Sequence, residues 1–380
     1  MPLAGNPYHF GSPVESPHFT DRVQELARLR ALMLNGQNLV LVSPRRYGKS
    51  SLLTKAAREV GELGGRTGRI SLMRCASQKD VAEVLLKGVL DGPLGWLHGH
   101  TAELMQLLKR IRLNPQAGID PGAPSGLSVS FGAHLADLPW QDAISDIIHL
   151  LGEAGDGDHP VTLILDEFQK AYEINPNIPD LMKDLVDELP AVSFVFAGSK
   201  RHLMDAMVND PDQGALYNIG HKLYLDRIPM TEFVDYLMRR AEAGGKQLQL
   251  AEATEIYERA MGVPNDVQLL AFWAYESAGT RIDGAAVSRA LRIAVGDSKA
   301  EFEARFDGLG LSQQRLLKLI AKRPLEHLKG QVVQAELGVS HTSVAKAADA
   351  LVKTELIEMK DGRWRVASGL LREWLVGDLD

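Results

Sequence analysis

One short segment, residues 41–52, constrains the fold of this chain more than any other. It reads Leu-Val-Ser-Pro-Arg-Arg-Tyr-Gly-Lys-Ser-Ser-Leu, which matches the pattern G-x-x-x-x-G-K-[ST] except that Ser43 stands at the first glycine. The apolar run 38–42 is typical of a buried parallel strand, and the apolar spacing over 50–59 indicates a helix. A loop between a strand and a helix presents backbone N–H groups to an anion. The segment therefore predicts an α/β fold with a phosphate-binding loop.

Within this loop, Lys49 is expected to reach the terminal phosphates of a nucleotide, and the Ser50 hydroxyl to ligate Mg²⁺. A chance match to Gly-Lys-Ser is the alternative explanation. The residues expected to contact the nucleotide are Ser43, Pro44, Arg45, Arg46, Tyr47, Gly48, Lys49, Ser50 and Ser51.

A second apolar run, 161–165, ends abruptly in the carboxylates Asp166 and Glu167. We interpret it as the strand that carries the Mg²⁺-organising Asp166, with Glu167 polarising the attacking water. The alternative is a strand that stops at a solvated acidic turn. A phosphate loop together with an apolar strand ending in Asp-Glu favours the catalytic interpretation.

A third strand is expected over 192–199, and it ends in the hydroxyl of Ser199. Ligands collect at the carboxyl ends of strands in open α/β sheets, so Ser199 is placed to sense the terminal phosphate. Ser199 is also a candidate N-cap for a helix over 200–208, and the two roles are compatible. The catalytic candidates are therefore Lys49, Glu167 and Ser199.

Five stretches of the sequence resemble the archaeal-type ATPases of the AAA+/STAND group. They are the N-terminal segment 6–26, the Ser-Pro-Arg-Arg-Tyr-Gly-Lys-Ser loop, Asp166-Glu167-Phe168-Gln169, Ala197-Gly198-Ser199 with Met204 and Met207, and Gly262-Val263-Pro264. The resemblance implies ATP and Mg²⁺ as cofactors, and a P-loop NTPase core of parallel strands. It also implies a helical lid in which Pro264 contacts the nucleotide, and a C-terminal winged-helix domain. The boundaries we predict are 1–229 for the core, 230–304 for the lid and 305–380 for the winged helix.

Two departures from the family pattern bear on mechanism. The segment 216–222 lacks the family's Gly-Arg pair, which puts an arginine finger in doubt. Arg201 and Arg227 lie nearby, and we expect both to be surface charges. No arginine follows Pro264, which fits the signalling branch of the group, with slow nucleotide exchange, better than the replication branch.

Composition agrees with a cytoplasmic protein of several domains. No apolar run approaches the ~18 residues of a membrane span, and the N-terminus lacks a secretory pattern. Cys75 is the only cysteine, and we place it in a second strand, 68–75, as a small core residue. The Pro- and Gly-rich stretch 114–126 reads as a surface loop, followed by a short edge strand over 127–131 and a helix over 140–154.

The lid is expected to open after a short strand at 223–229, with Thr231 as the N-cap of its first helix. Beyond it, a helix near 311–320, a short helix at 331–337 and a helix capped by Ser340 precede a hairpin that turns at Asp361-Gly362. This order is typical of a winged helix. Its candidate contacts to double-stranded DNA are Thr342, Ser343, Lys346, Lys360, Arg363 and Arg365.

The charge of this C-terminal segment leaves its partner open. Residues 306–380 hold 11 Lys and Arg against 10 Asp and Glu, and the whole chain carries −7. That balance is far from the basic footprint of a typical DNA binder, so a protein-interaction or oligomer-forming module is an equal alternative.

We therefore predict an ATPase that binds ATP or ADP, hydrolyses ATP slowly and acts as a nucleotide-dependent switch. Its output is DNA engagement or assembly with a protein partner or a second copy of the chain. One alternative is a nucleotide-binding interaction module with negligible hydrolysis. The other is a ring-forming ATPase that remodels DNA or loads proteins onto it, which the missing arginine weakens.

Overall fold

The computed structural model describes residues 5–15, 17–95, 116–119, 127–130, 139–155, 158–212, 214–328 and 330–377. The chain divides into two compact units. The first, called here the α/β unit, comprises Arg22–Arg45 and Leu52–Leu225. The second, the helical unit, comprises the N-terminal segment up to Asp21, the short stretch Arg46–Ser51 and everything from Asp226 onward.

The α/β unit is built on a parallel five-stranded sheet in the order β2-β5-β6-β1-β7. The strands are β1 (Leu39–Val42), β2 (Arg66–Ser71), β5 (Val161–Asp166), β6 (Val192–Gly198) and β7 (His221–Tyr224). The three central strands β1, β5 and β6 are buried along their whole length, whereas the edge strands β2 and β7 are not. This is why the central strands are continuous apolar runs that the sequence reveals.

The second strand differs from its prediction, because it ends at Ser71. Cys75 therefore lies beyond the strand, although its side chain is buried as expected.

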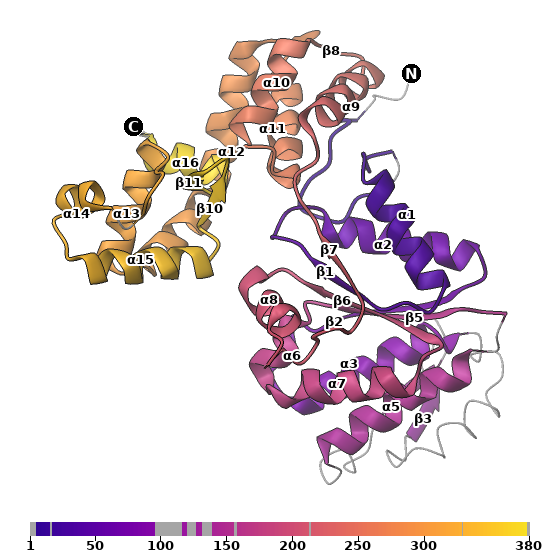
Figure 1. Cartoon of the computed structure of the whole chain (residues 1–380). Helices are drawn as coiled ribbons and strands as arrows, with labels where there is room; N and C mark the ends of the chain where they lie inside the picture. The colour runs from indigo at the N-terminus through magenta and orange to yellow at the C-terminus, as the bar shows by residue number, and fades with distance from the viewer. Residues whose placement is uncertain are drawn as a thin grey trace. The chain divides into compact units, whose positions relative to one another are not determined.

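Helices cover both faces of the sheet (Figure 1). On one face lie α1 (Val23–Leu34) and α2 (Lys49–Glu62), and on the other lie α3 (Gln78–Asp91), α5 (Trp140–Ala154) and α7 (Asn177–Glu188). Two shorter helices, α6 (Gln169–Ile174) and α8 (Arg201–Asn209), follow β5 and β6. The helix predicted over 140–154 is confirmed.

The sequence predicted a loop over 114–126, and this prediction is wrong for part of the stretch. Its residues Gln116–Ile119 form β3, which pairs antiparallel with β4 (Leu127–Ser130). The predicted strand at 127–131 is therefore present, and its partner comes from the segment that its glycine and prolines marked as a loop.

From Met230 onward, the helical unit contains four helices and a small two-stranded sheet in the segment predicted as the lid. They are α9 (Met230–Ala243), α10 (Leu250–Arg259), α11 (Pro264–Glu276), α12 (Gly284–Asp307) and a small parallel pair, β8 (Gln247–Leu248) with β9 (Arg281–Ile282). The N-cap of α9 is Pro229, so the capping role predicted for Thr231 is wrong. Thr231 lies inside the helix and donates its hydroxyl to Glu232.

Three helices and a hairpin follow, in the order expected of a winged helix. They are α13 (Leu311–Lys322), α14 (Gln331–Leu337), α15 (His341–Lys353), β10 (Ile357–Lys360) and β11 (Arg363–Val366), and α16 (Gly369–Val376) closes the chain. Ser340 caps α15 by accepting from the Ser343 N–H. Asp361 and Gly362 both have positive φ, as the predicted two-residue turn requires.

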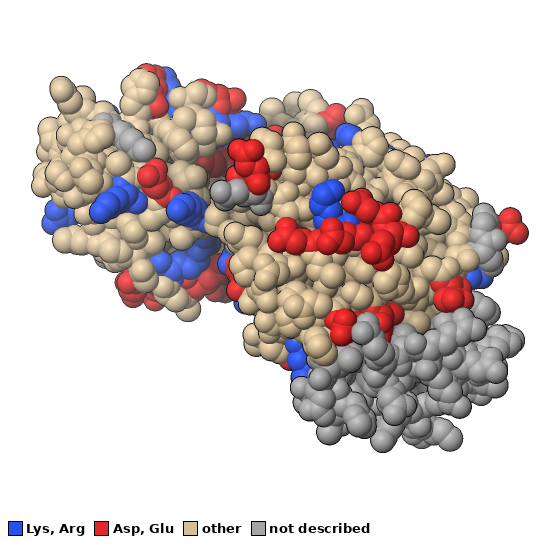
Figure 2. Space-filling view, turned by 60° about the horizontal axis from the view of Figure 1, so that its bottom comes forward, with Lys and Arg blue, Asp and Glu red and all other residues tan. Residues whose placement is uncertain are grey.

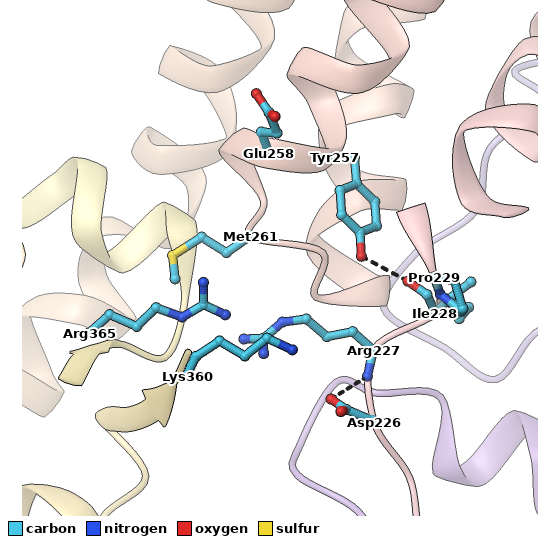
Figure 3. A pocket seen from close by; sticks show the side chains of 9 residues that line it. All are labelled: Asp226, Arg227, Ile228, Pro229, Tyr257, Glu258, Met261, Lys360 and Arg365. Atoms are coloured by element: carbon cyan, nitrogen blue, oxygen red, sulfur yellow. Dashed lines mark hydrogen bonds between the residues drawn. The ribbon is translucent and has the colours of Figure 1, made fainter. Parts of the chain in front are cut away.

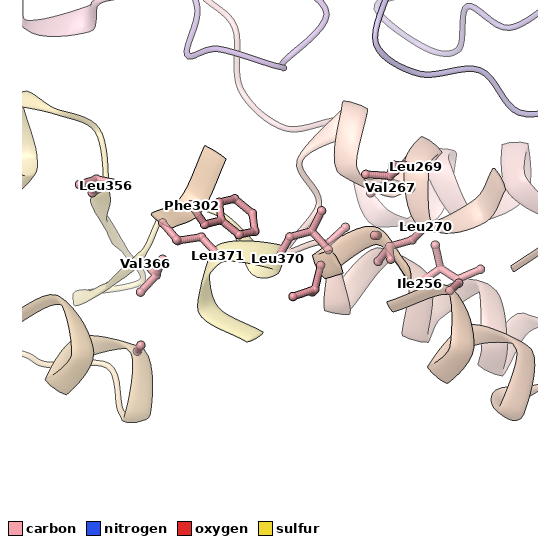
Figure 4. Close-up of a cluster of buried hydrophobic side chains, with 14 of the residues drawn as sticks. Ile256, Val267, Leu269, Leu270, Phe302, Leu356, Val366, Leu370 and Leu371 are labelled. Atoms are coloured by element: carbon pink, nitrogen blue, oxygen red, sulfur yellow. The ribbon is translucent and has the colours of Figure 1, made fainter. Parts of the chain in front are cut away.

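Lid and winged helix share one apolar core rather than two (Figure 4). Ile256 and Leu270 of the lid belong to the same buried cluster as Leu370 and Leu371 of α16. Backbone contact is so close that a Cβ on Gly369 would collide with the Arg259 carbonyl group. The predicted boundary at 304/305 falls inside α12, and the three-part division stays a prediction. No helix in the described part of the chain has the length and apolar character to span a membrane.

Candidate nucleotide site

The phosphate loop starts at the sheet position where ligands usually bind. Val42 is in register with Gly198, and the Ser43 N–H donates to the Gly198 carbonyl at 3.1 Å, so Ser43 lies beside the end of β6. From β1 the chain crosses to β2 at the far edge of the sheet, while β7 returns to the other side of β1. The carboxyl end of β1 is therefore a topological switch point.

The loop leads directly into a helix, as its sequence predicts. Gly48 has φ of +86°, a left-handed conformation that favours glycine, and α2 begins at Lys49. Lys49 is only 6% exposed and Ser51 is 7% exposed, whereas Arg45 lies at the surface. Ser51 accepts a hydrogen bond from the Val14 N–H at 3.0 Å, so the N-terminal segment is attached to the loop.

Within the helical unit, the loop also contacts the start of α11. The Arg46 carbonyl accepts from the Asn265 N–H at 3.2 Å, and Pro264 is the first residue of that helix. The Arg46 guanidinium lies 3.5 Å from Asp266 Oδ1 and 2.7 Å from Glu301 Oε2. The structure thus brings the start of α11, where Pro264 lies, next to the loop, and the contact of Pro264 with a nucleotide stays a prediction.

Asp266 is an unexpected member of this group. It is fully buried, accepts from the Ser368 hydroxyl at 3.2 Å, and has Arg46 as its charged partner. Burial raises the pKa of its carboxyl group, and the nearby Arg46 charge opposes the shift. From the sequence we noted only that no arginine follows Pro264. That observation does not predict that Asp266 holds the phosphate loop through Arg46.

The first carboxylate, Asp166, is held at the carboxyl end of β5. Its side chain is 5% exposed; Oδ2 lies 2.7 Å from Arg69 Nη2, and Oδ1 accepts from the Glu167 N–H at 2.9 Å. Arg69 is fixed in turn by donating to the Thr54 hydroxyl at 2.6 Å. Sequence reasoning missed Arg69, because only the register of β2 against β5 places it there.

These residues suit the chemistry of Mg²⁺, which prefers oxygen ligands and keeps several of its waters. In the α/β unit, Asp166 would supply such an oxygen.

Glu167 and Ser199 contact each other directly. Glu167 has φ of +56°, and its Oε2 accepts from the Ser199 hydroxyl at 2.6 Å and from Gln169 Nε2 at 2.5 Å. Space here is tight, because a Cβ at Gly198 would come within 2.6 Å of Gln169 Oε1. The alternative role of Ser199 as an N-cap is wrong: the N-cap of α8 is Lys200, without a side-chain cap.

The two arginines expected at the surface differ in burial. Arg201 is 61% exposed and lies 3.5 Å from Asp205. Arg227 contradicts the expectation: its side chain is only 9% exposed and pairs with Glu358 of the wing at 2.7 Å. Its guanidinium also lies over the Tyr47 ring of the phosphate loop, 5.5 Å from the ring centroid.

The candidate nucleic-acid residues do not form one free basic surface. Thr342 and Lys346 are exposed on α15, and Ser343 is half-buried. In the hairpin, Arg363 lies 3.4 Å from Glu326 and Arg365 lies 2.8 Å from Glu358. Figure 2 shows basic and acidic side chains interspersed on the face displayed.

Comparison with known proteins relates this geometry to solved structures. Scans against family models and curated proteins give no match. A Walker-type ATPase of Pyrococcus abyssi is 16% identical, with a TM-score of 0.69 over 97% of this chain and 99% of that one. The ORC2 protein of Aeropyrum pernix, solved with ADPNP and ADP, is 15% identical, with a TM-score of 0.60 over 95% of this chain and 94% of that one. The chain has the fold of a P-loop NTPase. At identities of 15–16%, the likeness establishes the fold alone.

Proposed function

We propose that this chain binds ATP with Mg²⁺, hydrolyses it slowly, and uses the bound nucleotide as a switch that sets the state of its lid and winged helix. Support for binding comes from the loop between β1 and α2, the buried Lys49, and the switch point at the end of β1. Such a loop stabilises phosphates because its backbone N–H groups and its lysine face the anion.

The observation that carries the proposal of slow hydrolysis is the environment of Glu167. Glu167 directly follows Asp166, the last residue of β5, and a carboxylate in this position can orient an attacking water. Here its Oε2 accepts hydrogen bonds from both Ser199 and Gln169. Such bonds stabilise the charged carboxylate and compete with water for it. Turnover would therefore require the Ser199 and Gln169 donors to reorient, for instance toward a bound phosphate.

The loop is joined to the lid by the Arg46–Asp266 pair, and the lid shares its core with the winged helix. In our proposal, phosphates that draw Arg46 toward themselves weaken this pair and release α11. The output then reaches the exposed residues of α15, which would engage DNA or a protein partner.

Lys49→Ala tests nucleotide binding, with Lys55→Ala on the same helix as the matched control. Loss of the point charge on the phosphates should weaken ATP binding by about tenfold or more, or about 1.4 kcal/mol. It should also remove most of the rise in melting temperature that ATP and Mg²⁺ give. Equal rises for wild type, Lys49→Ala and Lys55→Ala would refute the site.

Glu167→Gln tests hydrolysis separately from binding. The amide keeps the size of the side chain but lacks the charge that orients water, so we expect near-normal ATP affinity and turnover about 10²-fold lower. Ser199→Ala should affect turnover more than affinity, because it removes a donor to the same carboxylate. If wild type shows no ATP hydrolysis under any condition, the chain is a passive nucleotide-binding module instead.

A further inference from the structure

A cavity of about 330 Å³ lies within the helical unit, at the base of the wing (Figure 3). Three segments surround it: the linker between β7 and α9, the end of α10, and the hairpin. Its volume is at the lower end of the ~300–1,000 Å³ typical of small-molecule pockets. The lining residues are Asp226, Arg227, Ile228, Pro229, Tyr257, Glu258, Met261, Lys360 and Arg365.

The hairpin contributes a charged face to this cavity. Glu358 is paired with Arg365 across the strands, and Lys360 with Arg363. Because side chains alternate between the two faces of a strand, these four lie on the same face. In Figure 3 the head groups of Lys360 and Arg365 point toward that of Arg227 from the linker.

Two of these three cations share one carboxylate at this point. The same oxygen, Glu358 Oε1, accepts from Arg227 Nη2 at 2.7 Å and from Arg365 Nε at 2.8 Å. Within the described residues, the Lys360 ammonium makes no hydrogen bond or ion pair. The group that converges on the cavity thus has a formal charge of +2.

The two acids of the lining, Asp226 and Glu258, lie differently from Glu358, although the charge of Asp226 also acts on Arg227. Asp226 accepts from the backbone N–H of Arg227 at 2.7 Å. Glu258 extends away from the three cations in Figure 3. Counted together with Glu358, these two acids balance the formal charge of the three cations, so the cavity offers oriented cationic donors rather than a net positive charge.

One nitrogen of Arg227, its Nε, also lacks an acceptor. Its side chain is 9% exposed, and its buried Nε finds no hydrogen-bond partner in the described structure. A buried donor without a partner destabilises the fold, and the free-energy cost is larger when the donor belongs to a charged group. This cost favours a ligand that offers an acceptor from the cavity. The guanidinium is held in place by Glu358 and the Tyr47 ring, so it is already oriented.

We propose that this cavity is a binding site for a phosphoryl group, distinct from the nucleotide loop and formed by Arg227, Lys360 and Arg365. Two guanidinium groups and an ammonium are the groups that recognise a phosphate dianion. The phosphoryl group belongs either to a small phosphorylated molecule or to a nucleic-acid backbone. Through the contact of Arg227 with Tyr47, occupancy of this site reaches the phosphate loop.

Pyrophosphate is the probe, and titration calorimetry on the full chain is the measurement. All variants carry Lys49→Ala, so that binding at the nucleotide loop is suppressed. Lys360→Gln should weaken pyrophosphate binding by about tenfold, because it removes one of three cations without breaking a pair. Lys353→Gln, an exposed lysine of α15, is the control and should bind as the parent does.

Glu358→Gln gives an effect of opposite sign. The amide oxygen still accepts from the two guanidinium groups, but the negative charge is gone, so pyrophosphate should bind several-fold more tightly. A variant that merely disturbed the fold would weaken binding instead. Absence of pyrophosphate binding in the Lys49→Ala parent, or equal affinity in the Lys360→Gln and Lys353→Gln variants, would overturn the proposal.

Duplex DNA distinguishes the two sources of phosphate. If the backbone is the ligand, Lys360→Gln should flatten the slope of log affinity against log salt by about 0.9, the value for one lost contact. If the ligand is a small molecule, that slope is unchanged while pyrophosphate binding is still weakened.

Discussion

Removing the cation that faces Asp166 is the most direct test of how the sheet edge is assembled. Arg69→Met keeps much of the apolar stem of the side chain but deletes the guanidinium that lies 2.7 Å from Asp166 Oδ2. The Thr54 hydroxyl loses its donor at the same time. Asp166, whose side chain is 5% exposed, is then left as a buried charge without its cation.

The magnitude follows from the burial of the pair. Breaking a buried ion pair by deleting one partner costs about 3–5 kcal/mol. Arg69 is 26% exposed, so water reaches this pair and the lower end of the range, about 3 kcal/mol, applies. In a unit of this size each kcal/mol lowers the melting temperature by about 2–4 °C, so we expect a fall of about 6–12 °C.

Thermal unfolding followed by circular dichroism measures this fall, and a second variant tests its cause. Arg69→Met with Asp166→Asn removes both charges, and it should recover most of the lost stability because no buried charge remains unpaired. Arg58→Met, on the exposed side of α2, is the control and should change stability by no more than about 0.5 kcal/mol. If the double variant is no more stable than Arg69→Met, the ion pair does not explain the effect.

Two further predictions concern a buried acid and a helix cap. Because burial raises the pKa of Asp266, its folded form holds a proton more tightly than its unfolded form, so this site adds stability as pH falls toward the unfolded pKa of about 3.9. The melting temperature of wild type relative to Asp266→Asn should therefore rise as the pH is lowered from neutral toward about 4, and a constant difference would contradict this prediction. Ser77 caps α3 by accepting from the Asp80 N–H at 3.2 Å. Ser77→Ala should therefore lower the free energy of unfolding by about 1 kcal/mol in denaturant titrations. An unchanged midpoint would exclude the cap as a source of stability.

Much of the sheet was predictable because its central strands are buried on both faces. β1, β5 and β6 are continuous apolar runs, and each ends where the sequence changes to loop or carboxylate residues. The hairpin of the wing was predictable from Asp361-Gly362, since both positions require positive φ. Local chemistry determines these elements.

What the sequence did not reveal depends on pairing across long separations. Arg69 meets Asp166 because β2 is in register with β5, and Arg227 is buried because Glu358, 131 residues away, pairs with it. The Ser199 hydroxyl contacts Glu167 rather than capping α8 for the same reason. β3 was missed because its glycine and the neighbouring prolines indicate a loop, whereas pairing with β4 favours a strand.

The common core of the lid and the winged helix has a mechanical consequence. Ser368, at the start of α16, donates to the same Asp266 that Arg46 contacts from the phosphate loop. Apolar side chains of α10, α11, α12 and α16 fill the space between the lid and the winged helix. Close-packed interiors have low compressibility and transmit displacement instead of absorbing it. A small rotation of α11 would therefore move the winged helix with it as a rigid body, so that α15 is displaced. No hinge between the lid and the winged helix would be needed.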